Sequence, residues 1–229
     1  MLELDGAVLR DGFRLDVRLG VAEGARVAVM GPSGAGKSTL LLAIAGFVPF
    51  DGRIAWAGRE LGGLRPGERP VSLLFQDNNL FPHLDLAANL GLGLDPRGRL
   101  GAAERGKVEA ALERVGLGGF GERRPGTLSG GQQGRAALAR ALLRARPLML
   151  LDEPFAALGP ALRAEMLELV GEVAGETGAA VLMVTHLPED ARLLGESVIV
   201  VDEGRAAAPV PVGPLLDDPP EGLRRYLGT

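Results

Sequence analysis

The sequence contains no cysteine among its 229 residues. Disulfides and thiolate metal sites are therefore excluded, which suits a cytoplasmic protein. No stretch approaches the ~18 uncharged apolar residues of a membrane span. The N-terminus, MLELDGAVLRDGF, also lacks the basic start and apolar run of a secretion signal. The net charge of −4 argues against general nucleic-acid binding, so no nucleic-acid partner is expected.

Short apolar segments alternate with helical patterns along most of the chain. Strands separated from one another by helices are typical of an α/β fold with a parallel sheet. The first strands instead alternate polar and apolar residues and are divided by glycine turns. The segments predicted as strands are 2–9, 13–21, 26–30, 53–58, 71–75, 148–153, 181–186 and 197–201, and the predicted helices are 37–47, 104–116, 129–146 and 160–176.

The order of these segments predicts a single domain spanning residues 1–229. Its α/β core comprises residues 1–77 and 147–205, because the strand patterns stop after the first range and resume in the second. Between them, residues 78–146 form a helical insertion. Residues 206–229 form a proline-rich tail that is expected to wrap the surface.

The segment GPSGAGKST satisfies the spacing G-x-x-x-x-G-K-[ST]. Its glycines let the backbone curl so that N–H groups point at phosphate oxygens, and the following helix adds its positive end. Lys37 reaches the β- and γ-phosphates, and the Ser38 hydroxyl coordinates Mg²⁺. A chance glycine turn is the alternative, but the required strand and helix flank this one. The predicted nucleotide-binding residues of this phosphate loop are Gly31, Pro32, Ser33, Gly34, Ala35, Gly36, Lys37, Ser38 and Thr39.

Two carboxylates end the buried strand LMLLDE. A hydrophobic strand of a parallel sheet delivers its C-terminal residues beside the ligand. Asp152 is predicted to hold Mg²⁺, partly through water. Glu153 is predicted to act as the general base toward the attacking water. Two solvated acids at a strand end are the alternative, and the phosphate loop in the same chain weighs against it.

Two further polar residues follow predicted strands. Gln76 comes directly after VSLLF and is predicted to contact Mg²⁺ or the attacking water, and His186 follows VLMVT as a candidate partner of the γ-phosphate. Taken alone, each is more often structural; their positions at the ends of strands in one sheet favour a shared site. His83 lies in the loop segment LFPHL and is expected to be a surface or packing residue.

A second glycine-rich turn opens a helix about ninety residues after the first. Ser129 and the following glycine amides form another anion site at a helix N-terminus. This site lies in the helical insertion, beyond the expected reach of the phosphate loop in the same chain. The predicted nucleotide-binding residues of this signature loop are Ser129, Gly130, Gly131 and Gln132.

Together, the phosphate loop, Gln76, LSGGQ, LLDEP and His186 resemble the ATP-binding cassette ATPases. The resemblance covers essentially the whole chain, and LSGGQ is highly specific. It implies a P-loop NTPase (RecA-like) core with an antiparallel N-terminal β subdomain and an inserted helical subdomain. It also implies ATP and Mg²⁺ as ligands, and a head-to-tail homodimer. In such a dimer each signature loop closes on the ATP held by the partner's phosphate loop.

Three positions depart from the family pattern or fit it loosely. Gly134 interrupts the helix after the signature loop, at a cost of about 1 kcal/mol relative to alanine. Gly159 stands where the family has an aspartate that couples the two ATP sites. Phe13 is a candidate for the aromatic residue that stacks on adenine, although a core phenylalanine is an equal alternative.

Within the family, the segments RPVSLLFQDNNLFPHL and NLGLGL resemble the ATPases of bacterial importers, in particular thiamine importers. The resemblance implies a peripheral subunit on the cytoplasmic face of the inner membrane. Its partners would be transmembrane permease subunits and, indirectly, a periplasmic solute-binding protein. Residues 77–90 are expected to include the permease-docking surface. Alternatives are an importer ATPase for iron, sulfate or polyamine, a non-transport cassette scaffold, and a nucleotide-gated module without catalysis.

Overall fold

The computed structural model describes residues 1–10, 12–75, 77 and 79–227. Their strands form a sheet in the order β5-β4-β1-β2-β10-β9-β3-β8-β7-β6, with β11 paired to β9. The strands are β1 (Leu2–Arg10), β2 (Phe13–Val21), β3 (Arg26–Met30), β4 (Asp51–Trp56), β5 (Arg59–Glu60), β6 (Val71–Leu74), β7 (Leu148–Asp152), β8 (Ala180–Val184), β9 (Ser197–Asp202), β10 (Arg205–Ala206) and β11 (Val210–Pro211).

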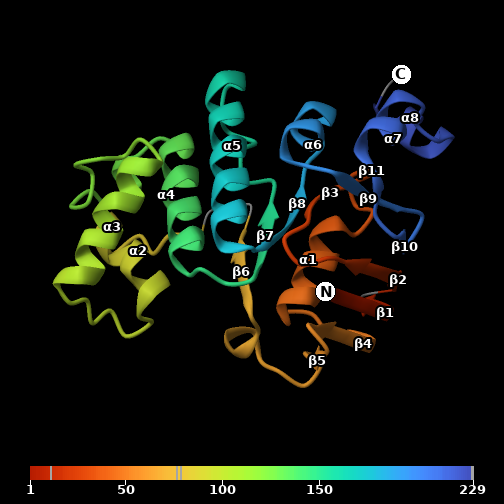
Figure 1. The fold of residues 1–229 in the computed structure, drawn as a ribbon, viewed down its shortest axis with the longest axis horizontal. Coiled ribbons are helices and arrows are strands. Elements are labelled where there is room, and N and C mark those ends of the chain that lie inside the picture. Colours follow the sequence, from red (N-terminus) through yellow and green to blue (C-terminus); the bar gives the residue numbers. More distant parts are fainter. Residues whose placement is uncertain (11, 76, 78, 228–229) are drawn as a thin grey trace.

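The helices lie around this sheet, as Figure 1 shows. They are α1 (Lys37–Ala45), α2 (Leu86–Leu94), α3 (Ala102–Arg114), α4 (Gly130–Leu143), α5 (Pro160–Thr177), α6 (Pro188–Leu194), α7 (Val212–Asp217) and α8 (Glu221–Leu227). The predicted strands and the four predicted helices are confirmed. The α/β fold class is confirmed as well.

Five strands, β9, β3, β8, β7 and β6, pair in parallel. Helices cover both faces of this part of the sheet, so its strands are mainly apolar rather than alternating. Every residue of β7 and β8 is buried. Because these strands run in one direction, the residues that follow them gather at one edge of the sheet.

The other side of the sheet is antiparallel. β1 pairs with β2 from Leu2↔Val21 to Arg10↔Phe13, and β1 also pairs with β4. Along β2, buried residues alternate with more exposed ones, as expected for a strand with one face toward the core. This register places Phe13 at the start of β2, opposite Arg10 at the end of β1.

Helices α2, α3 and α4 form a block at one side of the molecule (Figure 1). Apolar residues of all three helices join a cluster that continues into β7 and α5. The sequence predicted α3 and α4 but not α2, because LAANLGLGL contains two glycines, which lower helix propensity. Asp85 starts α2 by accepting a hydrogen bond from the Ala88 N–H at 2.7 Å. The exact limits of the insertion, 78–146, stay a prediction.

The proline-rich C-terminal tail contains a strand and two helices, β11, α7 and α8. β11 pairs with β9, and α7 and α8 pack beside Ala28, Met30 and Ala191. An ion pair of 2.6 Å joins Arg192 of α6 to Asp217 of α7. The tail therefore packs against one side of α6, the helix that follows β8.

Candidate functional site

The phosphate loop connects β3 to α1, as predicted. Gly31 has φ 147°, and a Cβ at this position would collide with the carbonyl oxygen of Val201. Gly36, the N-cap of α1, has φ 104°. A Cβ there would lie 2.8 Å from Cζ of Phe13, which places the Phe13 ring against the loop. Only glycine satisfies both the conformation and the space at these two positions.

Lys37 points back into this loop. Its Nζ donates to the carbonyl oxygens of Gly31 and Pro32, each at 2.8 Å, and the residue is 8% exposed. Burial lowers the pKa of the ammonium group, while the nearby carboxylates of Glu153 and Asp152 raise it. A cation that donates to carbonyl oxygens of the loop itself is in place to bind a phosphate that enters the loop.

Ser38 and Asp152 meet at the edge of the sheet, where the Ser38 Oγ donates to Asp152 Oδ1 at 3.0 Å. Burial raises the pKa of the Asp152 carboxyl, whereas the Ser38 hydrogen bond lowers it. A hydroxyl and a carboxylate are oxygen ligands that suit Mg²⁺, which otherwise keeps water and phosphate oxygens. Within the part of the chain that is described, no group of three or more acidic or histidine side chains forms a complete metal site.

The third predicted Mg²⁺ ligand, Gln76, lies outside the described residues. Its predicted roles toward the metal and the attacking water stay predictions. The strand that leads to it, β6, pairs in parallel with β7, so this strand ends beside the Asp152 strand.

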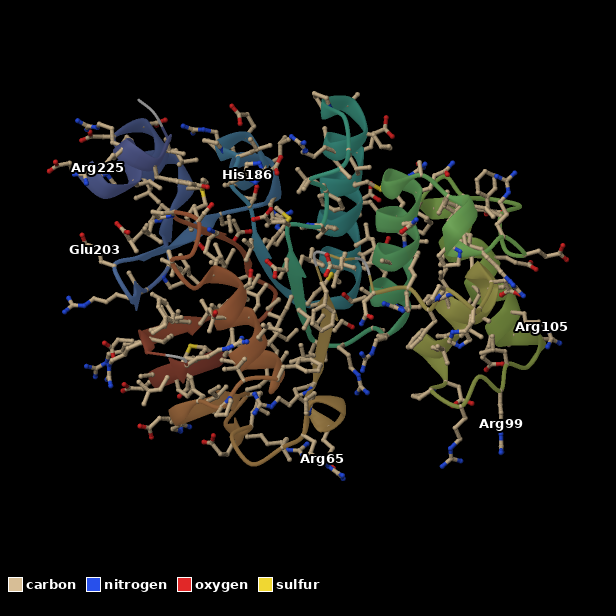
Figure 2. The ribbon with its side chains drawn as sticks, turned by 180° about the vertical axis from the view of Figure 1, so that it is seen from behind. Arg65, Arg99, Arg105, His186, Glu203 and Arg225 are labelled. Atoms are coloured by element: carbon tan, nitrogen blue, oxygen red, sulfur yellow. The ribbon has the colours of Figure 1, made fainter. Side chains whose placement is uncertain are left out.

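Glu153 and His186 face each other from neighbouring strands. The distance between His186 Nδ1 and Glu153 Oε2 is 3.8 Å. Glu153 follows β7 in the left-handed backbone region, with φ 46°, and its N–H donates to the Val184 carbonyl at 3.2 Å. A non-glycine residue in this region is uncommon and often marks a functional position. Figure 2 shows His186 between α5 and the C-terminal helices, where Arg225 is labelled.

The cleft beside Glu153 also contains residues that the sequence interpretation missed. Arg163, Thr185 and Asp190 line it together with Glu153 and His186. No sequence spacing connects Arg163 with Glu153. Thr185 directly precedes His186, and Asp190 follows it by four residues. Polar residues this near a candidate catalytic histidine could have been predicted to belong to the same site.

The signature loop forms the N-terminus of α4. Ser129 Oγ accepts from the Gln132 N–H at 3.3 Å, and the Ser129 N–H donates to Gln132 Oε1 at 2.9 Å. This capping box explains the Ser and Gln at this spacing. Helix α4 continues through Gly134 without a break. Figure 1 shows α4 on the other side of β6 and β7 from α1, so the two loops belong to separate parts of the molecule.

A groove of about 560 Å³ lies between the helical block and the core. Phe47 and Phe81 line it and are 54% and 42% exposed. Three arginines also line it: Arg140, Arg144 and Arg146. Burial lowers the pKa of the Arg140 guanidinium, and Arg144 lowers it further. The groove thus combines exposed aromatic side chains with a positive wall. His83, near its edge, is exposed, as predicted.

Comparisons with known proteins agree with this geometry. A family described as "ABC transporter" matches residues 15–156. A protein named "Thiamine import ATP-binding protein ThiQ" from Cereibacter sphaeroides is 65% identical over 100% of both chains. A protein of the same name from Ruegeria sp. is 56% identical, again over 100% of both chains.

Solved structures resemble the chain as well. One described as "Dimeric Structure of MJ0796, a Bacterial ABC Transporter Cassette" has a TM-score of 0.83 and 30% identity. A second, of the same cassette in a "post-hydrolysis state" bound to ADP and Pi, has a TM-score of 0.82 and 30% identity. Each alignment covers 93% of this chain and 99% of the other.

Proposed function

Because the chain belongs to the ABC transporter family, we propose that it hydrolyses ATP to drive solute uptake through a separate permease. The observation that carries this proposal is the gathering of Lys37, the Ser38–Asp152 pair and the Glu153–His186 pair at one edge of the parallel sheet. A phosphate cradle, a metal site and a base beside them are the parts that phosphoryl transfer to water requires.

Each residue has a distinct role in the proposed reaction. The backbone of the phosphate loop and Lys37 hold the phosphates, and Ser38 and Asp152 hold Mg²⁺. The metal, when bound, offsets negative charge on the phosphate oxygens. Glu153 accepts a proton from the attacking water. The water oxygen bonds to the γ-phosphorus as the bond between that phosphorus and the ADP oxygen breaks. His186 donates a hydrogen bond to the γ-phosphate.

We further infer that two copies bind ATP head to tail, with Mg²⁺ at each site. Within one chain the signature loop and α1 lie on opposite sides of β6 and β7 (Figure 1), so the anion site at the start of α4 is available to the nucleotide of a partner. The capping box leaves this helix N-terminus formed and exposed in the monomer. An isologous dimer provides two such sites at once.

Phe13 is proposed as the residue that stacks on adenine. Its ring lies against Gly36 at the N-terminus of α1, and the residue is only partly buried. An aromatic face beside the phosphate loop is in place to stack on the base of a nucleotide held there.

Restoring the family aspartate at residue 159 is expected to increase ATP turnover. Gly159 is the N-cap of α5, without a side-chain cap, and a Cβ there meets nothing within 4 Å. Gly159→Asp therefore fits, and capping adds a few tenths of a kcal/mol, or about 1 °C in Tm. Turnover and thermal melting of both forms test this. A rate that is unchanged or lower contradicts the proposed coupling of the two sites through this residue.

The groove with the positive wall is the proposed docking site for the permease. It includes Phe81 from the predicted segment 77–90 and extends beyond that segment to Phe47 and Arg140. Asn89 shapes its edge, because its side chain exchanges hydrogen bonds with the Phe81 N–H and carbonyl at 2.7 and 3.0 Å. An apolar segment that carries a carboxylate fits such a surface.

We assign the chain to the cytoplasmic face of the bacterial inner membrane, because ATP is supplied there. No helix in the described ranges is long and apolar enough to cross a membrane, so the proposed permease subunits form the pore. A periplasmic solute-binding protein would deliver the solute to them. The solute proposed is thiamine or thiamine pyrophosphate, on the strength of the similar proteins named for thiamine import.

Reconstitution tests the proposed solute. The chain is combined in proteoliposomes with candidate permease and solute-binding proteins from the same organism, and uptake of labelled thiamine is measured with ATP inside. We expect ATP-dependent uptake that Glu153→Gln abolishes. Uptake of iron, sulfate or a polyamine in place of thiamine would contradict the solute. ATPase activity without any permease association would instead favour a cassette scaffold.

A further inference from the structure

We propose that Thr185 and Asp190 are positioning residues that hold His186 toward Glu153 during ATP hydrolysis. The inference deepens the proposed function and rests on it, because it concerns how one residue of that site is oriented. It starts from the short connection between β8 and α6, in which Thr185, His186 and Leu187 follow one another.

A buried hydrogen-bond network closes this connection. Thr185 Oγ1 donates to Asp190 Oδ2 at 2.8 Å. The same oxygen accepts from the Leu187 N–H at 3.1 Å. The Thr185 N–H in turn donates to the Val29 carbonyl at 3.2 Å, which continues the pairing of β8 with β3. Both neighbours of His186 are therefore fixed, one by the sheet and one by the Thr185 hydroxyl.

The burial of this network contrasts with the exposure of the residue that it surrounds. Thr185 and Asp190 are 3% and 7% exposed, whereas the His186 side chain is 50% exposed. An exposed imidazole has many accessible rotamers, and its backbone position limits where it can reach. The buried hydrogen bond between Thr185 and Asp190 fixes this backbone position. Breaking it is costly, because the remaining partner becomes a buried polar group without a hydrogen bond.

Helix α6, which contains Asp190, is held in place by contacts with the C-terminal tail. Ala191 is fully buried against the tail, and the exposed Arg192–Asp217 ion pair also links α6 to α7. Asp190 lies on this held helix and lines the same cleft as Glu153. A shift of Asp190 would therefore move the backbone of His186 relative to Glu153.

The distance between His186 and Glu153 explains why the position of His186 affects the rate of hydrolysis. At 3.8 Å, His186 Nδ1 and Glu153 Oε2 are neighbours without a direct hydrogen bond. At this separation, a single reacting oxygen placed to one side can lie within hydrogen-bond distance of both atoms. Displacements of about 1 Å at a reacting centre can cost on the order of 10²-fold in rate. We expect the loss of the network to lower kcat by about 10-fold, while KM for ATP changes less than 2-fold.

The experiment measures kcat and KM for MgATP hydrolysis with the full chain. Thr185→Val removes the hydroxyl with little change in shape, and Thr185→Ser restores it. Because a lone Thr185→Val leaves the buried Asp190 carboxylate without its donor, the double variant Thr185→Val with Asp190→Leu is included. Replacing both partners by apolar groups avoids leaving the buried Asp190 carboxylate unsatisfied, and Thr185→Ser keeps the acceptor that the Leu187 N–H loses in both valine variants. Glu189→Gln, an exposed acid on the same helix, is the matched control. Thermal melting accompanies every variant.

We expect Thr185→Val and the double variant to have a reduced kcat. Thr185→Ser and Glu189→Gln should keep the wild-type kcat, and the double variant should remain folded. When Thr185→Val is added to His186→Ala, we expect no further decrease in kcat. Wild-type kcat in the folded double variant would overturn the proposal, as would equal losses with and without His186. If His186→Ala alone leaves kcat unchanged, the role of His186 in the proposed function fails instead.

Discussion

Replacing Glu153 with glutamine is expected to lower ATP hydrolysis by about 10²–10⁴-fold, the range that a general base contributes, while ATP binding is kept. Glutamine has nearly the same size but cannot accept the proton from water. The groups that hold phosphate and metal, Lys37 and the Ser38–Asp152 pair, are unchanged. The Glu153 side chain is 25% exposed, and glutamine keeps its size and polarity, so folding is not expected to suffer.

The measurement pairs steady-state turnover with direct ATP binding. Glu153→Gln and the wild type are compared for phosphate release and for ATP affinity at equal Mg²⁺. Glu189→Gln makes the same change of charge at an exposed acid of α6 and serves as the control. A Glu153→Gln rate within 3-fold of wild type would remove Glu153 from the role of base. No hydrolysis by the wild type under any condition would favour a nucleotide-gated module.

The parallel half of the fold could be predicted because its strands are buried on both faces. LMLL and AVLMV are continuous apolar runs, and every residue in them is buried. Helices α2 and α6 were missed for a physical reason as well. One contains two glycines, and the other has seven residues, too few to show a helical period.

The site likewise contains residues that the local sequence predicted and contacts that depend on tertiary packing. Lys37 begins a helix, Asp152 ends a strand, and Glu153 and His186 follow strands that the sequence already indicated. Parallel strands bring such positions together. The contact between Phe13 and Gly36 depends on the packing of the antiparallel half against α1. The groove depends on how the helical block lies beside the core. Neither arrangement has a local sequence pattern, so neither could be read in advance beyond the segment 77–90.

Cysteines at residues 33 and 157 are expected to crosslink between two copies of the chain when ATP is trapped. The wild-type sequence has no cysteine, so every crosslink reports on the introduced pair. Ser33 is an exposed residue of the phosphate loop. Ala157 is exposed too, and its Cβ lies 3.9 Å from the position of a Cβ on Gly130. Residue 157 therefore reports the position of the signature loop.

The test combines Ser33→Cys, Ala157→Cys and Glu153→Gln in one chain and adds a short bis-maleimide. With MgATP, the proposed dimer brings residue 33 of one copy near residue 157 of the other at two equivalent places. Covalent dimer should then rise from a minor species to most of the protein, and ADP should not support it. Arg105→Cys in place of Ala157→Cys is the control, because Figure 2 shows Arg105 in the helical block, far from His186.

The single-cysteine variants decide between arrangements. In a head-to-tail dimer neither Ser33→Cys nor Ala157→Cys alone meets its own copy, because a phosphate loop faces a signature loop at each site. Efficient crosslinking of Ser33→Cys alone would mean that two phosphate loops face each other, and the signature loop would then have no nucleotide to contact. With Glu153→Gln saturated by ATP and its permease present, absence of the 33–157 crosslink would contradict the shared ATP site.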